Sequence, residues 1–209
     1  AAGSPDEALE SLLQVDTLMI ELGYGLVSMA DPAKGGYLLQ RITGVRKSFA
    51  QDMCFIVPSI RLRDSLHLGP NQYQFLLRGQ VIASGEVMPG HWMAMNTANS
   101  TVVLKGVQTT EPVFKLPANW VDEVERRNAE MAGYTVVYAS SVMVTHLSES
   151  IRRHAYQILT RQDVQVLVDT LKDDHPALVN ELVPSLLNIG QIQRILQNLL
   201  SEVIPIRNL

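Results

Sequence analysis

The sequence predicts an α+β protein of several subdomains: a mixed α/β first subdomain, a small inserted β-α second subdomain, and the all-helical start of a third. Three observations predict this class. Segments with strand and helix periodicity alternate in the first part of the chain, the composition shifts at Pro89-Gly90, and only helical periodicity remains from Thr160 onward. With 209 residues, the chain is long enough to bury a core in one or two domains.

The first part of the chain predicts a βαβ unit followed by a hairpin. A helix is expected over residues 38–53, where apolar residues recur at helical spacing. A turn is expected at Gly79, between two alternating segments. The expected strands are residues 18–28, which Gly23 and Gly25 interrupt, 55–63, 73–77 and 81–87. Together these elements predict a mixed sheet with a helix on one face.

The middle of the chain predicts a small β-α insert that begins after Pro89-Gly90. We expect short strands at 91–95 and 101–104, a loop over 105–117, and a charged helix over 119–131. A strand at 134–138 and the helix after it are then expected to return to the first domain. That helix shows an apolar stripe beginning at Val144, and Thr145 is expected to be its N-cap, with Glu149 in its first turn.

From Thr160 onward, the sequence predicts only helices. Thr160 and Asp163 have the spacing of a capping box, a second helix starts at Pro176 and stops by Pro184, and a third covers 191–203. The apolar ending after residue 203 suggests a truncated domain or a surface that pairs with another chain. Residues 1–17 are expected to form a linker.

Composition excludes several classes of function. A net charge of -4 disfavours nucleic-acid binding, which usually requires clustered basic residues. One cysteine, Cys54, precludes an internal disulfide and fits a reducing compartment. No apolar run approaches the roughly 18 residues that would cross a bilayer, and no signal peptide opens the chain. We therefore expect a soluble, intracellular fragment.

The titratable residues do not form a recognisable catalytic pattern. The five histidines lack metal-ligand spacing, so we expect no metal and no cofactor. Ser140 and Ser141 precede His146, which invites a hydrolase interpretation, but serines at a strand end are ordinarily turn residues. Cys54 is expected to be a buried small residue and not a nucleophile. We predict a non-enzymatic binding or scaffold domain with no catalytic residue.

Several segments resemble one family over nearly the whole chain from Leu12 onward. The matching segments are Leu22-Gly23-Tyr24-Gly25-Leu26, residues 46–53 leading to Val57-Pro58, Ile60-Arg61-Leu62-Arg63-Asp64, Pro89-Gly90-His91-Trp92, residues 111–117, 133–137, 155–162 and 203–209. Taken together they resemble the cytoplasmic region of the flagellar and type III secretion export-gate proteins, the FHIPEP family. The segment from Phe49 to Val57 looks more flagellar than injectisome-like.

The resemblance implies a fragment of a larger inner-membrane protein, lying on the cytoplasmic face of the bacterial inner membrane. The implied subdomains are 18–89 with 139–158, an inserted 90–138, and a partial helical 159–209. The implied function is a docking platform that receives export chaperones carrying late substrates and helps order their export. Further implied partners are the ATPase complex, a partner gate protein and identical subunits in a ring, with no nucleic acid.

In such a protein, the docking dimple would use Glu111, Phe114 and Thr145, and Gly23 would influence subdomain arrangement. Independently of the resemblance, an exposed aromatic beside a carboxylate is a natural interaction hot spot. Phe114 could instead plug the second subdomain onto the first. Three other functions stay open: a purely structural ring module, the equivalent component of a virulence injectisome, and a hydrolase or transferase.

Overall fold

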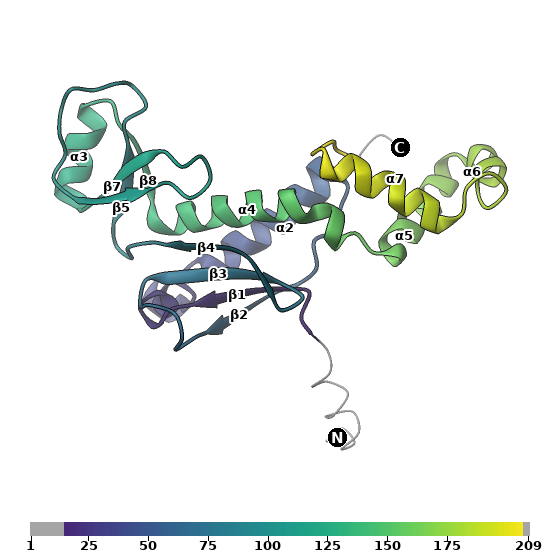
Figure 1. The fold of residues 1–209 in the computed structure, drawn as a ribbon, viewed down its shortest axis with the longest axis horizontal. Helices are drawn as coiled ribbons and strands as arrows, with labels where there is room; N and C mark the ends of the chain where they lie inside the picture. Colours follow the sequence, from purple (N-terminus) through teal and green to yellow (C-terminus); the bar gives the residue numbers. More distant parts are fainter. Residues whose placement is uncertain (1–14, 207–209) are drawn as a thin grey trace, which may run out of the picture. The chain divides into compact units, whose positions relative to one another are not determined.

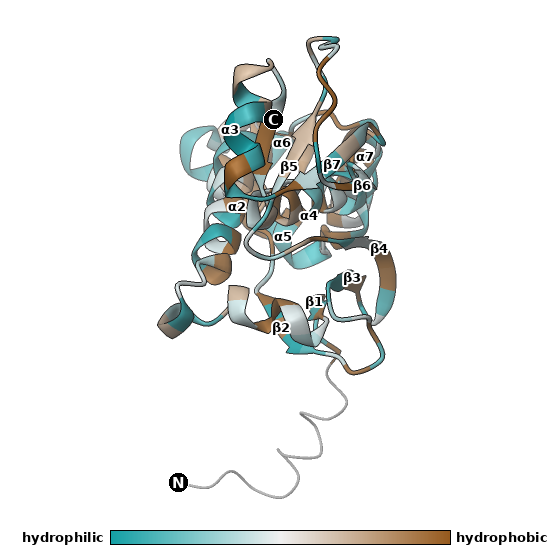
Figure 2. Cartoon of the chain, turned by 90° about the vertical axis from the view of Figure 1, so that its left-hand side faces the viewer, coloured by the Kyte–Doolittle hydropathy of each residue, from teal (hydrophilic) through white to brown (hydrophobic). Residues whose placement is uncertain are grey.

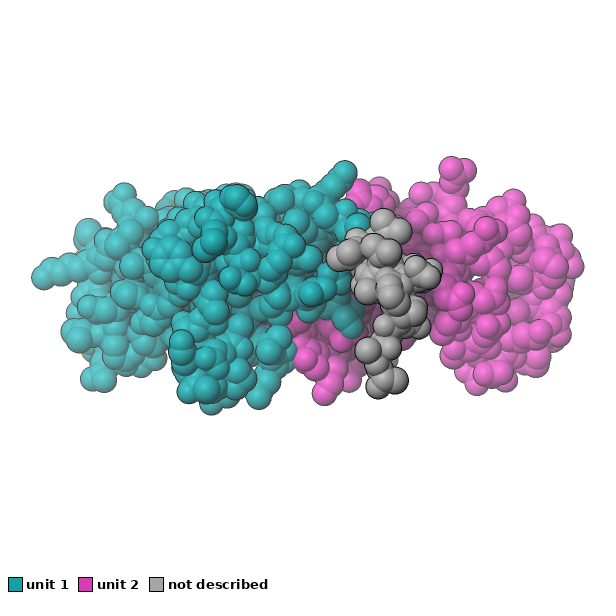
Figure 3. All heavy atoms as spheres, turned by 90° about the horizontal axis from the view of Figure 1, so that it is seen from below, with its two compact units in different colours: residues 1–40, 59–147 teal, residues 41–58, 148–209 magenta. Residues whose placement is uncertain are grey.

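The computed structural model describes residues 15–206, which form two compact units (Figure 3). Unit 1 combines the residues up to Gln40 with Ser59–Leu147, and unit 2 combines Arg41–Pro58 with the residues from Ser148 onward. Helices and two four-stranded sheets confirm the predicted α+β class (Figure 1). Most of the linker predicted over 1–17 lies outside the described residues.

The first sheet of unit 1 has the strand order β2-β1-β3-β4. Strands β1 and β2 are parallel and the other two pairs are antiparallel, which confirms the predicted βαβ unit and hairpin. The elements in this part of the chain are β1 Leu18–Leu22, two 3₁₀ helices at Tyr24–Met29 and Pro32–Lys34, α2 Leu38–Met53, β2 Ile60–Asp64, β3 Gln72–Leu77 and β4 Gln80–Glu86. Helix α2 belongs to unit 2 from Arg41 onward.

The hairpin between β3 and β4 closes through a two-residue turn. Leu77 pairs with Gln80, and both Arg78 and Gly79 have positive φ, at 48° and 80°. Two positive φ values are the geometry of the turn whose twist suits a tight hairpin. The turn predicted at Gly79 is therefore confirmed.

Two predicted strands are shorter than expected. The first ends at Leu22 because a 3₁₀ helix begins at Tyr24. The second begins only at Ile60, since Cys54 has a φ of 50° and Pro58 has no backbone N–H to donate to a ladder.

The second sheet of unit 1 has the order β6-β7-β5-β8, and all its pairs are antiparallel. Its elements are β5 Trp92–Met95, β6 Val107–Thr110, β7 Pro117–Val121, α3 Glu123–Met131 and β8 Thr135–Tyr138. Strand β8 pairs with β5, so the expectation that this strand returns to the first domain is wrong.

Three other expectations for this insert are also corrected. Residues 101–104 are not a strand, whereas β6 lies within the segment expected to be a loop. The helix expected from 119 begins at Glu123 instead, because Ala118 and Trp120 alternate into the interior as strand residues. The Asp122 side chain then caps α3 by accepting a hydrogen bond from the Glu125 backbone N–H.

Helix α4, Ala139–Ile158, begins six residues before Thr145, so the N-cap predicted at Thr145 is wrong. The buried stripe starts at Ala139 and continues through Met143, Leu147 and Ile151, each four residues apart. The sequence interpretation started that stripe at Val144, which is only half-buried. Thr145 therefore lies in the second turn of the helix and is exposed.

Unit 2 is helical, and its helices after α4 are α5 Arg161–Asp174, α6 Pro176–Leu182 and α7 Ile189–Ser201. The capping box of Thr160 and Asp163 is confirmed. A second one, formed by Asn188 and Gln191, starts α7 two residues earlier than predicted. Hydrophobic and hydrophilic segments are mixed along the helices (Figure 2), and α7 buries Ile192, Leu196 and Leu200 on one face.

Candidate functional site

A short loop between β6 and β7 presents the most exposed aromatic ring among the described phenylalanines. We call residues 111–116 the Glu111 loop. The Glu111 N–H donates to the Leu116 carbonyl at 2.8 Å, and the Lys115 N–H donates to the Glu111 carbonyl at 3.0 Å. Phe114 stands on this loop with 72% of its surface exposed, while Val113 beside it is buried.

The Glu111 carboxylate holds this loop from inside. One oxygen accepts from the Val113 N–H at 2.8 Å, and the other accepts from the Phe114 N–H. Only 7% of Glu111 is exposed. The sequence interpretation treated this carboxylate as an exposed charge beside the aromatic. In the structure it is a buried acceptor that fixes the backbone of Phe114, a local side-chain-to-backbone pattern known from turns and caps.

Tyr73 on β3 contacts helix α4 within unit 1. The Tyr73 hydroxyl lies 2.8 Å from Nδ1 of His146, the residue after Thr145. Tyr73 is fully buried and His146 is 8% exposed. Burial raises the pKa of the Tyr73 phenol above its usual range, and the negative charge of Glu111 raises this pKa further. The buried phenol of Tyr73 therefore keeps its proton and contacts the neighbour of Thr145.

Gly23 lies at the end of β1, where another loop passes very close. The Gly23 N–H donates to the Gln72 carbonyl at 2.8 Å, and the Gly25 N–H donates to the Pro70 carbonyl at 2.9 Å. A Cβ placed on Gly23 would be 2.0 Å from the Gly69 carbonyl oxygen. Gly23 thus permits a backbone approach that no other residue would allow. Because Gln72 precedes Tyr73, this approach also fixes the start of β3.

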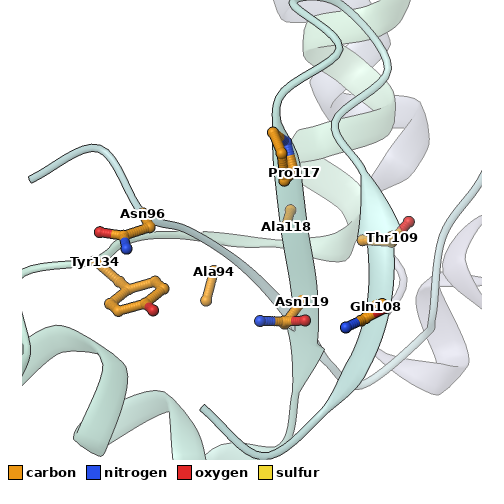
Figure 4. A pocket seen from close by; sticks show the side chains of 8 residues that line it. All are labelled: Ala94, Asn96, Gln108, Thr109, Pro117, Ala118, Asn119 and Tyr134. Carbon is orange, nitrogen blue, oxygen red and sulfur yellow. The ribbon is translucent and has the colours of Figure 1, made fainter. Parts of the chain in front are cut away.

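One pocket of unit 1 lies on the second sheet and holds no acid–base pair. A pocket of about 320 Å³ in unit 1 is lined by Ala94, Asn96, Gln108, Thr109, Pro117, Ala118, Asn119 and Tyr134 (Figure 4). Tyr134 is its only titratable side chain, and its hydroxyl donates to the Val102 carbonyl at 2.7 Å. General acid–base chemistry requires paired titratable groups, which this pocket lacks.

Other signals for chemistry are equally weak. Cys54 is half-buried beside an apolar groove of unit 2, lined also by Phe55, Ile56 and Leu167. Ser140 and Ser141 lie inside the first turn of α4 and not at a strand end. Across residues 15–206, there is no group of three or more His, Cys, Asp or Glu side chains placed to hold a metal ion. Within the same range, no helix has the length and apolar character that crossing a bilayer requires.

Comparisons with known proteins agree with the resemblance seen in the motifs. The FHIPEP family profile matches residues 1–209. The chain is 40% identical over 203 residues to flagellar biosynthesis protein FlhA of Bacillus subtilis strain 168, covering 97% of this chain and 30% of that protein. It is 41% identical over 204 residues to FlhA of Borreliella burgdorferi, covering 98% and 29%. The chain thus spans about a third or less of the length of the curated relatives it matches.

Solved structures share the fold. The Chlamydia pneumoniae CdsV protein superposes with a TM-score of 0.77 at 24% identity, covering 93% of this chain and 57% of that chain. The cryo-EM structure of nonameric EPEC SctV-C gives a TM-score of 0.66 at 18% identity, covering 100% and 58%. The motif resemblance is therefore confirmed by a family match over the whole chain and by this shared fold. The chain belongs to the FHIPEP family.

Proposed function

We propose that this chain is a docking platform of the flagellar-type protein export apparatus. It binds export chaperones that carry late substrates and helps order their export, without a catalytic step of its own. The names of its relatives, flagellar biosynthesis proteins at about 40% identity, support the flagellar assignment over the injectisome one. In the whole protein this region lies at the cytoplasmic face of the bacterial inner membrane.

The observation that supports docking best is an exposed aromatic ring on a firmly held loop. Phe114 is 72% exposed, yet its backbone N–H is bonded to the buried Glu111 carboxylate. Binding loses less conformational entropy when the anchoring side chain is already held in its bound geometry. Exposed aromatic anchors supply much of the free energy of protein interfaces. Leu116 is 41% exposed and Thr145 is also exposed, so both side chains are available to the partner in the proposed site.

Isothermal titration calorimetry with an export chaperone carrying a late flagellar substrate tests this function. Phe114→Ala is expected to weaken binding by about 2 kcal/mol or more, roughly 30-fold in Kd, as interface hot spots do. Met131→Ala is the matched control, because Met131 is an equally exposed apolar residue, at 80%, on α3 of the same unit. An unchanged Kd for a folded Phe114→Ala variant would remove Phe114 from the site.

Ring assembly is a second candidate function, favoured by one structural relative. The EPEC SctV-C structure is nonameric, and CdsV has also been solved in complex with CdsO. We propose that the whole protein forms a homo-oligomeric ring and contacts other export components, including the ATPase complex and a partner gate protein. Light scattering of the complete cytoplasmic region measures this assembly. A ring that forms normally while chaperones fail to bind would favour the purely structural role.

We propose that the chain contains three functional lobes. The first combines residues 18–89 with 139–158, the second is 90–138, and the third is 159–209. In this division, Gly23 influences how the subdomains are arranged, and its close approach to the loop at Gly69 supports that role. Limited proteolysis of the complete cytoplasmic region tests it. Cleavage is expected near residues 89, 138 and 159, and cleavage confined to the interiors of the lobes would contradict the division.

A further inference from the structure

We propose that strand β6 and the pocket beside it bind an extended, uncharged peptide segment of another protein, which adds a strand to the second sheet of unit 1. This inference goes beyond the docking of chaperones, because it involves neither Phe114 nor Thr145. Three features of unit 1 carry it. They are an open strand edge, two amide side chains without partners, and a pocket lined without any Asp, Glu, Lys, Arg or His residue.

Strand β6 lies at one end of its sheet, and among the described residues only β7 pairs with it. Just after β6, the Glu111 N–H donates to the Leu116 carbonyl across the hairpin, on the β7 side. Successive residues of a strand present their N–H and C=O groups to alternate sides, so those of Gln108 and Thr110 point away from β7. This outer edge can therefore receive an added strand through main-chain hydrogen bonds.

The composition of β6 does not protect this edge. Natural edge strands are commonly shielded by charged side chains, especially lysine, or by proline. Strand β6, Val107–Thr110, contains neither. By contrast, β2 lies at an end of the first sheet and carries Arg61, Arg63 and Asp64. Strand β6 is thus better suited than β2 to pair with a strand from another protein.

The pocket supplies polar groups that match a peptide bond. Gln108 and Asn119 are cross-strand partners, and Asn119 also pairs with Ala94. Figure 4 shows the two amide groups next to each other, with Tyr134 across Ala94 from them. Within residues 15–206, neither amide side chain forms a hydrogen bond. Each amide offers donors and an acceptor, as a peptide bond does, and Asn119 is already half-buried, so a peptide would satisfy groups that the protein leaves unbonded.

The two faces of an added strand would meet different surroundings. Side chains opposite Gln108 and Thr110 would lie on the pocket side, and those between them would lie beside Val107, which is 56% exposed on the other face. A charged peptide residue on the pocket side would lose hydration without gaining an ion pair. We therefore expect a segment in which uncharged polar residues alternate with β-branched apolar residues.

NMR titration of the isotope-labelled chain with a synthetic peptide tests the inference. The probe is a short acetylated and amidated peptide of alternating threonine and valine, with a Gly-Ser tail for solubility. We expect the amide signals of Gln108 and Thr110 to shift and their hydrogen exchange to slow. The control peptide carries a methyl group on every amide nitrogen, so it keeps the side chains and lacks the donors. It is expected to bind about tenfold more weakly or less.

Two variants separate the edge from the pocket. Gln108→Pro removes the outward N–H together with the amide side chain, and an edge strand tolerates proline where the nitrogen faces solvent. Asn119→Ala removes only the pocket amide. We expect the peptide Kd to rise about tenfold or more for Gln108→Pro and roughly fivefold for Asn119→Ala. Asn198→Ala is the matched control, because Asn198 is an exposed amide on α7 of unit 2, and its Kd is expected to stay unchanged.

Equal binding of the methylated and unmethylated peptides would overturn the inference, as would shifts confined to residues outside β6 and the pocket. A Gln108 shift that depends on protein concentration without peptide would also overturn it, because the edge would then pair with a second copy of the chain. If Gln108→Pro does not fold, an unchanged Kd for Asn119→Ala still refutes the pocket. Peptide binding by a chain that binds no loaded chaperone would support this inference and refute the proposed function, so the two can fail separately.

Discussion

A single methyl group added at Gly23 is expected to destabilise unit 1 by steric conflict alone. Gly23 has a φ of -62° and a ψ of 155°, which alanine adopts without strain. Its Cβ, however, would be 2.0 Å from the Gly69 oxygen and 2.7 Å from the Pro70 oxygen. Both are backbone atoms, so no side-chain rotation relieves the contact. The loop must retreat by about 1 Å or more before the contact becomes tolerable.

The free-energy cost of Gly23→Ala depends on the hydrogen bonds that hold the loop in place. Two hydrogen bonds, from Gly23 to Gln72 and from Gly25 to Pro70, resist its movement. Overpacking of this kind costs about 1–3 kcal/mol, which lowers the melting temperature of a chain of this length by roughly 2–12 °C. Gly44→Ala is the contrasting control, because its Cβ would meet nothing within 4 Å in the interior of α2. It is expected to stabilise by about 0.5–1 kcal/mol.

Differential scanning calorimetry of the two variants and the unmodified chain, at one pH, measures both effects. Chaperone titration of Gly23→Ala adds a functional measurement, because the displaced loop leads directly into Gln72 and Tyr73. A Gly23→Ala protein that melts at or above the temperature of the unmodified chain would refute the steric argument. A lower melting temperature for both glycine variants would point to a general intolerance of alanine and not to the close approach.

Three further changes have calculable outcomes. The hydrogen bond from Arg63 lowers the pKa of the Glu21 carboxyl, although burial opposes this effect. The pair therefore stabilises the fold above the ordinary carboxyl pKa of about 4.3. That contribution is lost as the pH falls through the lowered pKa. Arg63→Ala should therefore cost roughly 1 kcal/mol in urea unfolding at pH 7. The cost should shrink as the pH falls through the lowered pKa of Glu21, and an equal loss at every pH would contradict this. Thr160→Ala removes the capping box with Asp163 and should cost about 1 kcal/mol, with faster amide exchange in the first turn of α5. Leu196→Ala, at a site 1% exposed, should cost about 2–5 kcal/mol and release amide protection in unit 2, whereas release confined to unit 1 would contradict the assignment of its core.

Elements with strong local signals were predicted correctly. The helix over 38–53, the hairpin turn at Gly79 and the capping box at Thr160 each depend on residues within one or two turns of one another. Periodicity and turn chemistry are local properties, so they are readable without knowing what packs against them. The sequence left Phe114 open to an exposed or a buried interpretation, and the structure shows it 72% exposed.

Errors arose where packing partners distant in the chain decide the outcome. The start of α4 was misplaced because Ala139 and Met143 are recognisably core residues only once buried. Strand β8 joins the second sheet by pairing with β5, some 40 residues earlier, and adjacency in sequence to α4 could not indicate that. The inward position of Glu111 was missed for a similar reason, although a carboxylate two and three residues before free backbone N–H groups is a usable signal.

Composition, periodicity and short motifs can be recognised in the sequence, so the fold class, the family and the residues to test could be inferred from it. The burial and the contacts of those residues became known only from the tertiary structure. In the structure, the Glu111 carboxylate is buried and accepts a hydrogen bond from the Phe114 N–H, Thr145 lies within α4, and the Tyr73 hydroxyl contacts His146. The physical reason is that burial and hydrogen-bond pairing depend on segments meeting in space, and a carboxylate or phenol changes its role with the groups it meets.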